Sequence, residues 1–71
     1  MRMSDLLPNQ SGRVECIEND ASGRLSELGL TRGSTVRCLF RAPTGDPTAY
    51  LIRDVAVALR RHDAAKVRLM Q

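Results

Sequence analysis

Residues with the chemistry of a catalytic or metal site are few in this chain. Its 71 residues include one histidine, His62, and two cysteines, Cys16 and Cys38. No serine or cysteine has a histidine and a carboxylate at a spacing typical of nucleophilic catalysis, and no glycine-rich loop is present that would hold a phosphate. His62 next to Asp63 is typical of a solvated turn. The sequence therefore predicts a protein that is not an enzyme.

Metal binding is the next chemistry that these residue types could support. Cys16 and Cys38 are 22 residues apart with no CxxC motif, and alternation places both on apolar strand faces, where a free cysteine acts as a small hydrophobe. We expect both thiols to be buried, reduced and unbridged. His62 and Asp63 are weak candidates for a surface metal site, because two adjacent ligands do not complete a coordination shell. The sequence predicts no required cofactor and at most weak binding of a divalent ion.

Positive charge is modest and has no aromatic residues interleaved with it. Ten arginines and one lysine against eight acidic residues give a net charge of +3 and a pI near 9.5. The arginines expected on outward strand faces are Arg13, Arg37, Arg41, Arg60 and Arg68. A barrel that binds single strands also needs a platform of aromatic rings, and Tyr50 is the one outward candidate. The sequence thus predicts no nucleic-acid partner, although its charge is compatible with an acidic one.

The elements that position these residues are short. Polar clusters interrupt the chain every eight to twelve residues, a spacing typical of short strands in a barrel or sandwich. Alternating apolar residues predict five strands, at residues 13–18, 34–41, 48–53, 55–60 and 66–70. The pattern therefore predicts a mostly β protein, with about five strands in a small, strongly bent barrel.

One short helix is predicted after the first strand, over residues 21–28, where apolar residues recur at spacings of four and three. Asp20 or Ser22 can cap its N-terminus, and Gly29 suits the left-handed position that ends it. Residues 61–64 are expected to form a single helical turn. Such a short helix needs packing against the sheet to be stable.

The predicted core is aliphatic, since the chain has no tryptophan, one phenylalanine and one tyrosine. It is expected to contain Val14, Cys16, Leu25, Leu28, Val36, Cys38, Phe40, Val57, Leu59, Val67 and Leu69. Pro47 lacks a backbone N–H, so we expect it to begin an edge strand. A tight hairpin is predicted at residues 53–54, because Asp54 tolerates a positive φ.

Nothing in the sequence predicts insertion into a membrane. The longest apolar run, residues 55–59, has five residues, which is far too short to span a bilayer. The first residues lack the apolar stretch of a signal peptide. We therefore expect a cytoplasmic protein that forms a single domain over residues 1–71.

Four segments of the sequence together resemble the FeoA family, small cytoplasmic proteins associated with the bacterial ferrous iron transporter FeoB. The matching segments are residues 12–14, residues 24–30 with Gly33 and Val36, residues 42–47, and residues 57–64. In order and spacing they extend over roughly residues 5–69. The resemblance implies an SH3-like β-barrel with one short helix after the first strand, which agrees with the order of elements derived from the residues.

The resemblance also implies a non-enzymatic accessory or regulatory protein of ferrous iron uptake. Its partner would be the cytoplasmic part of a FeoB-like membrane GTPase transporter, which would hold the chain at the inner membrane. A metal-binding or metal-sensing protein is the alternative, a nucleic-acid-binding barrel is less favoured, and a weak homo-oligomer stays open.

We expect the partner to contact the short helix and the proline-flanked loop at residues 43–47. The candidate residues are Arg24, Glu27, Arg41, Pro43, Gly45, Asp46 and Pro47. Two prolines stiffen the loop, so it would lose little entropy on docking. Asp46 would offer a carboxylate to the partner, while Arg24 and Arg41 would meet acidic groups. In a competing interpretation Asp46 only caps its own turn.

Overall fold

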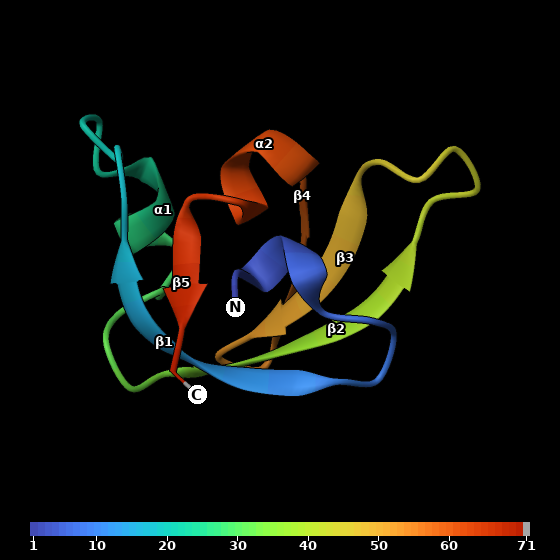
Figure 1. Ribbon diagram of the computed structural model, residues 1–71, viewed down its shortest axis with the longest axis horizontal. Coiled ribbons are helices and arrows are strands. Elements are labelled where there is room, and N and C mark those ends of the chain that lie inside the picture. The colour runs from blue at the N-terminus through green and yellow to red at the C-terminus, as the bar shows by residue number, and fades with distance from the viewer. Residues whose placement is uncertain (71) are drawn as a thin grey trace.

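The computed structural model describes residues 1–70, in which five antiparallel strands form one strongly curved sheet (Figure 1). The strands are β1 Ser11–Ile17, β2 Thr35–Arg41, β3 Thr48–Ile52, β4 Val55–Leu59 and β5 Val67–Leu69. The helical segments are the 3₁₀ turn η1 Met3–Asp5 and the single-turn helices α1 Arg24–Glu27 and α2 Arg61–Ala64. The strand order is β4-β3-β2-β1-β5, so β4 and β5 are the edges. The predicted mostly β class with about five strands is confirmed.

The sheet curves because β1 pairs with a different neighbour along each half of its length. Its first half pairs with β2, with Gly12 opposite Val36, and its second half pairs with β5, with Val14 opposite Leu69. Gly12 allows this close crossing, because a Cβ atom there would lie 2.7 Å from a methyl carbon of Leu69. The bend lets few strands enclose a core.

Two residues predicted for the core, Cys16 and Phe40, are at the surface instead. Cys16 is exposed, and Phe40 is 62% exposed. Each follows a register shift in its strand pair, between Val14 and Cys16 in β1 and between Cys38 and Phe40 in β2. A bulge adds one residue to the strand and reverses the side chains that follow, so strict alternation fails beyond it.

The core also contains residues beyond the expected eleven. Those absent from the predicted set are Met3, Leu6, Leu30, Tyr50, Ile52 and Ala64, all at most 1% exposed. Tyr50, expected to point outward, packs inside, and its hydroxyl donates a hydrogen bond to the Met3 carbonyl at 3.4 Å. Leu28 and Val57 are only half-buried at the margin of the core. The remaining predicted members are buried: Val14, Leu25, Val36, Cys38, Leu59, Val67 and Leu69.

Strand β3 lies between β2 and β4, so the prediction that Pro47 begins an edge strand is wrong. Pro47 stands just before the first strand residue, Thr48, where its missing N–H removes no bond from the β3 ladder. The predicted hairpin at residues 53–54 is confirmed. Arg53 and Asp54 have φ of 48° and 64°, as a two-residue type I′ turn requires.

Helix α1 is shorter than predicted because the chain turns before it. Gly23 adopts a left-handed φ of 72°, and its N–H bonds to the Asp20 carbonyl at 3.0 Å, so the helix begins at Arg24. The Asp20 carboxylate accepts the N–H groups of Leu25 and Ser26 at 3.3 and 3.2 Å. Asp20 thereby caps the helix N-terminus, as predicted, although it lies four residues before the first helical residue.

Candidate functional site

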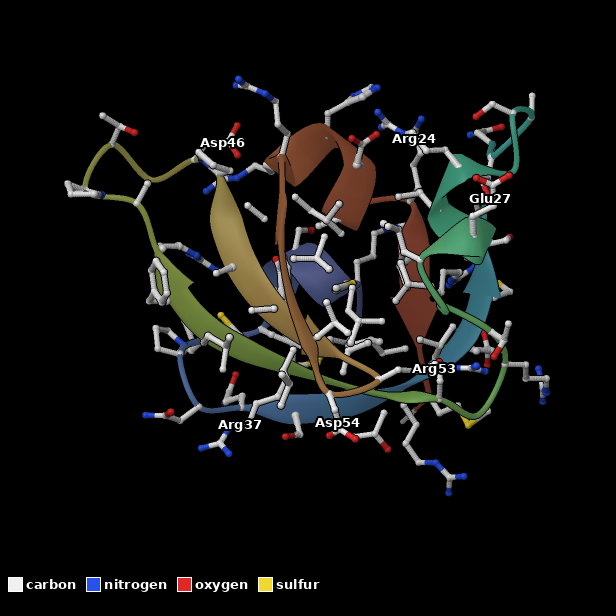
Figure 2. All side chains as sticks on the ribbon, turned by 180° about the vertical axis from the view of Figure 1, so that it is seen from behind. Arg24, Glu27, Arg37, Asp46, Arg53 and Asp54 are labelled. Carbon is white, nitrogen blue, oxygen red and sulfur yellow. The ribbon has the colours of Figure 1, made fainter. Side chains whose placement is uncertain are left out.

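Helix α2 connects the two segments that the sequence assigned to the partner site. At one end of α2, the Asp46 carboxylate accepts a hydrogen bond from the Arg61 N–H at 2.9 Å. At its other end, Arg24 of α1 forms an ion pair with Asp63 at 2.5 Å. Figure 2 shows Asp46 and Arg24 along one edge of the molecule with α2 between them. We call this surface, made of residues 42–47, α1 and α2, the α1–α2 face.

The loop at residues 42–47 is held in shape by its own hydrogen bonds. The Gly45 N–H bonds to the Ala42 carbonyl at 2.7 Å, and the Ala42 N–H bonds to the Pro47 carbonyl at 3.0 Å. The Thr44 hydroxyl donates to the Asp46 carbonyl at 2.9 Å. Gly45 has a φ of 92°, which favours glycine at this position. The loop therefore projects between β2 and β3 as an ordered structure (Figure 1).

Asp46 acts on another element rather than on its own turn. Helix α2 follows Arg60, whose side chain makes no capping hydrogen bond, and the Asp46 carboxylate takes the N–H of the first helical residue instead. An oxygen acceptor at a helix start satisfies a backbone donor that has no partner within the helix. Asp46 is thus a capping residue, as the competing interpretation has it, but the segment that it caps is α2 and not its own turn.

Helix α1 presents one cation and one anion to solvent. The Arg24 side chain is 65% exposed, whereas its partner Asp63 is 15% exposed and also lies 3.7 Å from the Lys66 ammonium. Glu27 is exposed, and its side chain has no hydrogen-bond or ion-pair partner among residues 1–70. Arg24 and Glu27 are therefore placed where a partner protein could reach them.

The Arg41 side chain is engaged by the N-terminal segment, contrary to the expectation of an outward side chain. It is half-buried, and its guanidinium donates to the carbonyls of Leu6 and Ser4 at 2.9 and 3.3 Å. These bonds fasten η1 and the residue that follows it to the end of β2. The structure gives Arg41 a role in holding the N-terminal segment.

The candidate metal ligands do not form a built site. His62 is exposed, and the Asp63 carboxylate already faces Arg24 and Lys66. Over the described part of the chain, no group of three or more histidine, cysteine, aspartate or glutamate side chains could hold a metal ion. Neither cysteine is in a disulfide, and burial raises the pKa of the Cys38 thiol, which disfavours the thiolate that binds metals.

A hollow that the sequence did not reveal lies beside the α1–α2 face, between α1 and β4. It has a volume of about 320 Å³, with an apolar floor of Leu28, Val57 and Leu59. Its rim carries Arg24, Arg60 and Asp63. The sequence contained one signal of it, the apolar run at residues 55–59, but only the strand order shows that this run forms an edge.

Comparison with known proteins identifies the family to which this chain belongs. The sequence profile of the FeoA domain matches residues 1–70. The chain belongs to the FeoA family. The family resemblance inferred from four sequence segments is thereby confirmed. None of the helices within residues 1–70 has the length and apolar character needed to cross a bilayer.

A curated relative places a FeoA domain in the same polypeptide as the transporter. A fusion of Fe(2+) transport protein A with the Fe(2+) transporter FeoB from Porphyromonas gingivalis is 36% identical to this FeoA domain over 69 residues. The match covers 94% of this chain and 8% of the fusion protein, so the chain spans less than a tenth of that relative. The family is therefore associated with ferrous iron transport.

Solved structures of relatives share the fold over nearly the whole chain. FeoA from Stenotrophomonas maltophilia, solved with zinc and described as a prokaryotic SH3 domain protein, is 33% identical with a TM-score of 0.87, and the match covers 99% of this chain and 89% of that one. FeoA from Chlorobium tepidum is 28% identical with a TM-score of 0.89, covering 97% and 68%. The SH3-like β fold is confirmed.

Proposed function

We propose that this FeoA domain is a non-enzymatic accessory of ferrous iron uptake that binds the cytoplasmic part of a FeoB transporter. The observation that supports this most is the P. gingivalis relative, in which a FeoA-like segment and FeoB form one polypeptide. Fusion keeps two proteins together at high effective concentration, which is useful when the separate proteins bind each other weakly. The chain would then act in the cytoplasm, next to the inner membrane that holds its partner.

The α1–α2 face has the properties that a docking surface for FeoB needs. Its loop is ordered by internal hydrogen bonds, so docking would cost little conformational entropy. Arg24 and Glu27 offer exposed charges of both signs on α1. A surface this small should give a modest and partly electrostatic interface, hence a reversible one that weakens as salt is added.

The candidate residues divide into those that contact FeoB and those that shape the surface. Arg24, Glu27 and Pro43 are exposed and would touch the partner. Gly45 and Pro47 set the path of the loop, and Asp46 fixes it to α2. Arg41 would act indirectly, since it holds the N-terminal segment against β2.

Metal binding is the second candidate, because the S. maltophilia relative was solved with zinc. The residues present here do not fit a resident metal, since Asp63 is engaged by two cations and His62 has no third ligand nearby among residues 1–70. Calorimetric titration of the chain with Zn²⁺ and with Fe²⁺ under reducing conditions separates the candidates. Tight one-to-one binding would favour a metal sensor or carrier over an accessory protein.

The experiment that tests the proposed function is capture of FeoB from native membranes with this FeoA domain as bait. We expect FeoB to be retained at low salt and released as salt is raised. The Arg24→Ala variant should retain less, whereas Arg37→Ala should retain as much as the unaltered chain, because Figure 2 shows Arg37 at the opposite edge from Arg24. Failure of the unaltered chain to retain FeoB would contradict the proposal.

A further inference from the structure

Strand β4 is a sheet edge with none of the features that normally protect one. Natural edge strands are blunted by charged residues, prolines or bulges, because their unpaired peptide groups attract other chains. Residues 55–59 contain only valine, alanine and leucine, and their pairing with β3 shows no register shift. Val55 is 60% exposed, and Ala56 and Ala58 are exposed as well.

The other edge, β5, is covered, which makes the open edge at β4 distinctive. Arg2 forms an isolated bridge with Arg68 of β5, and the Leu69 N–H bonds to the Met1 carbonyl at 2.8 Å. The N-terminal segment therefore lies along β5. Within residues 1–70, β4 is the edge whose peptide groups stay available.

The hairpin geometry tells which peptide groups of β4 point away from the sheet. In a hairpin with a two-residue turn, the residues on either side of the turn, here Ile52 and Val55, form a hydrogen-bonded pair. Hydrogen-bonded and non-bonded pairs then alternate, so the N–H and C=O groups of Ala56 and Ala58 point outward. No backbone hydrogen bond from another segment of the described chain reaches these two residues.

The surface next to this edge is apolar at its floor and positive at its rim. Leu28 and Val57, both half-buried, form the floor of the hollow between α1 and β4. The rim has two guanidinium groups, of Arg24 and Arg60, against one carboxylate, of Asp63. Lys66 further offsets the charge of Asp63, while the Arg60 guanidinium has no ion-pair or hydrogen-bond partner in residues 1–70.

We propose that β4 binds an extended peptide segment of a partner protein as an added strand, and that this segment alternates apolar and acidic residues. Its backbone would pair with Ala56 and Ala58. Alternate side chains of a strand point to opposite faces, so its apolar residues would cover Val57 and Leu28 while its carboxylates meet Arg60 and Arg24. This proposal rests on the proposed function in one respect only: if that function holds, the protein that carries the added strand is FeoB.

The test uses the isotope-labelled chain and three synthetic hexapeptides, followed by NMR. One peptide alternates glutamate and valine, the second has the same composition with the three glutamates first, and the third replaces glutamate by lysine. We expect the alternating acidic peptide to shift the amide signals of Ala56, Ala58 and Leu28 and to slow hydrogen exchange at both alanines. The other two peptides should bind about tenfold more weakly or not at all.

Three variants of the chain test the backbone pairing and the charge preference separately. Ala58→Pro removes an outward N–H without removing a bond to β3, and should abolish strand addition, whereas Ala58→Ser retains the N–H and should bind normally. Arg60→Glu should weaken the acidic peptide and strengthen the lysine peptide. Equal binding of all three peptides, shifts centred elsewhere, or pairing of β4 with a second copy of the chain without peptide would overturn the proposal. Because FeoB is absent from these samples, this result is independent of the capture experiment.

Discussion

The side-chain carboxylate of Asp46 accepts a hydrogen bond from the backbone N–H of Arg61 at 2.9 Å, across fifteen positions of the sequence. This bond ties the loop between β2 and β3 to the first turn of α2. Because Arg24 binds Asp63 at the other end of the same turn, the loop and α1 are both anchored to α2. The α1–α2 face is therefore one connected surface.

Replacing Asp46 by alanine should lower the free energy of unfolding by about 0.5–2 kcal/mol, since the Arg61 N–H then loses its acceptor. Asp46→Asn keeps a side-chain oxygen and should lose much less. Denaturant unfolding of the three proteins measures the difference. An alanine variant as stable as the unaltered chain, but defective in binding FeoB, would instead make Asp46 a direct contact.

Two leucines of the α1 region should differ sharply in their contribution to stability. Leu25 is 1% exposed, so Leu25→Ala should cost about 2–5 kcal/mol through the lost burial and the cavity left behind. Leu28 is half-buried in the floor of the hollow, at the margin of the core, and Leu28→Ala should cost only about 1 kcal/mol. Thermal and denaturant unfolding provide the comparison. Equal losses would show that both side chains belong to the core.

The two cysteines should react at very different rates with a thiol reagent. Cys16 is exposed and should be labelled quickly in the native protein. Cys38 is fully buried, and burial raises the pKa of its thiol, so its labelling should wait for unfolding. The Cys16→Ser variant isolates the slow thiol. Fast labelling of that variant under native conditions would contradict the placement of Cys38.

Acid should destabilise the chain in part through Asp20. Burial opposes ionisation of this carboxyl, but hydrogen bonds from the Leu25 and Ser26 N–H groups and the Ser26 hydroxyl outweigh it and hold its pKa below the usual range. The pKa of Asp20 is lower in the folded chain than in the unfolded chain, where it is about 3.9. Ionised Asp20 therefore stabilises the fold at pH values above about 3.9, and this contribution is lost as the pH falls through the folded-state pKa.

Unfolding at about pH 6 and at about pH 3 tests this link. The unaltered chain should lose more stability between the two conditions than Asp20→Asn, whose side chain cannot titrate. Glu27→Gln, in the helix that Asp20 caps, serves as a control, since the Glu27 carboxylate accepts no hydrogen bond within residues 1–70. The same loss in all three proteins would remove Asp20 from the acid response.

Local pattern predicted the strands of this protein better than the direction of their side chains. Alternation located β1 and β2, but the bulges that turn Cys16 and Phe40 outward depend on which residues lie across the strand pair. Tyr50 was the one outward candidate for an aromatic platform, yet it packs inside, where its hydroxyl donates to the Met3 carbonyl of a distant segment. The direction of all three side chains depends on contacts between segments far apart in the sequence, which a local hydrophobic pattern does not contain.

The candidate site was predictable to a similar degree. Family motifs pointed to α1 and to the loop at residues 43–47, and the structure brings them together through α2. The bonds that do so, from Asp46 to Arg61 and from Arg24 to Asp63, join segments far apart in the sequence. The open edge at β4 was likewise hidden, because an apolar run of five residues fits a central strand as well as an edge.

An NMR titration of the labelled chain with the purified cytoplasmic part of FeoB tests the central claim most directly. We predict that the shifted amide signals cluster at residues 24–27, 43–47 and 61–64, and that Arg24→Ala weakens binding about tenfold, or about 1.4 kcal/mol, while Arg37→Ala leaves it unchanged. An unshifted spectrum at saturating FeoB, or shifts centred on Arg37 and Asp54 at the opposite edge of the molecule, would contradict the account.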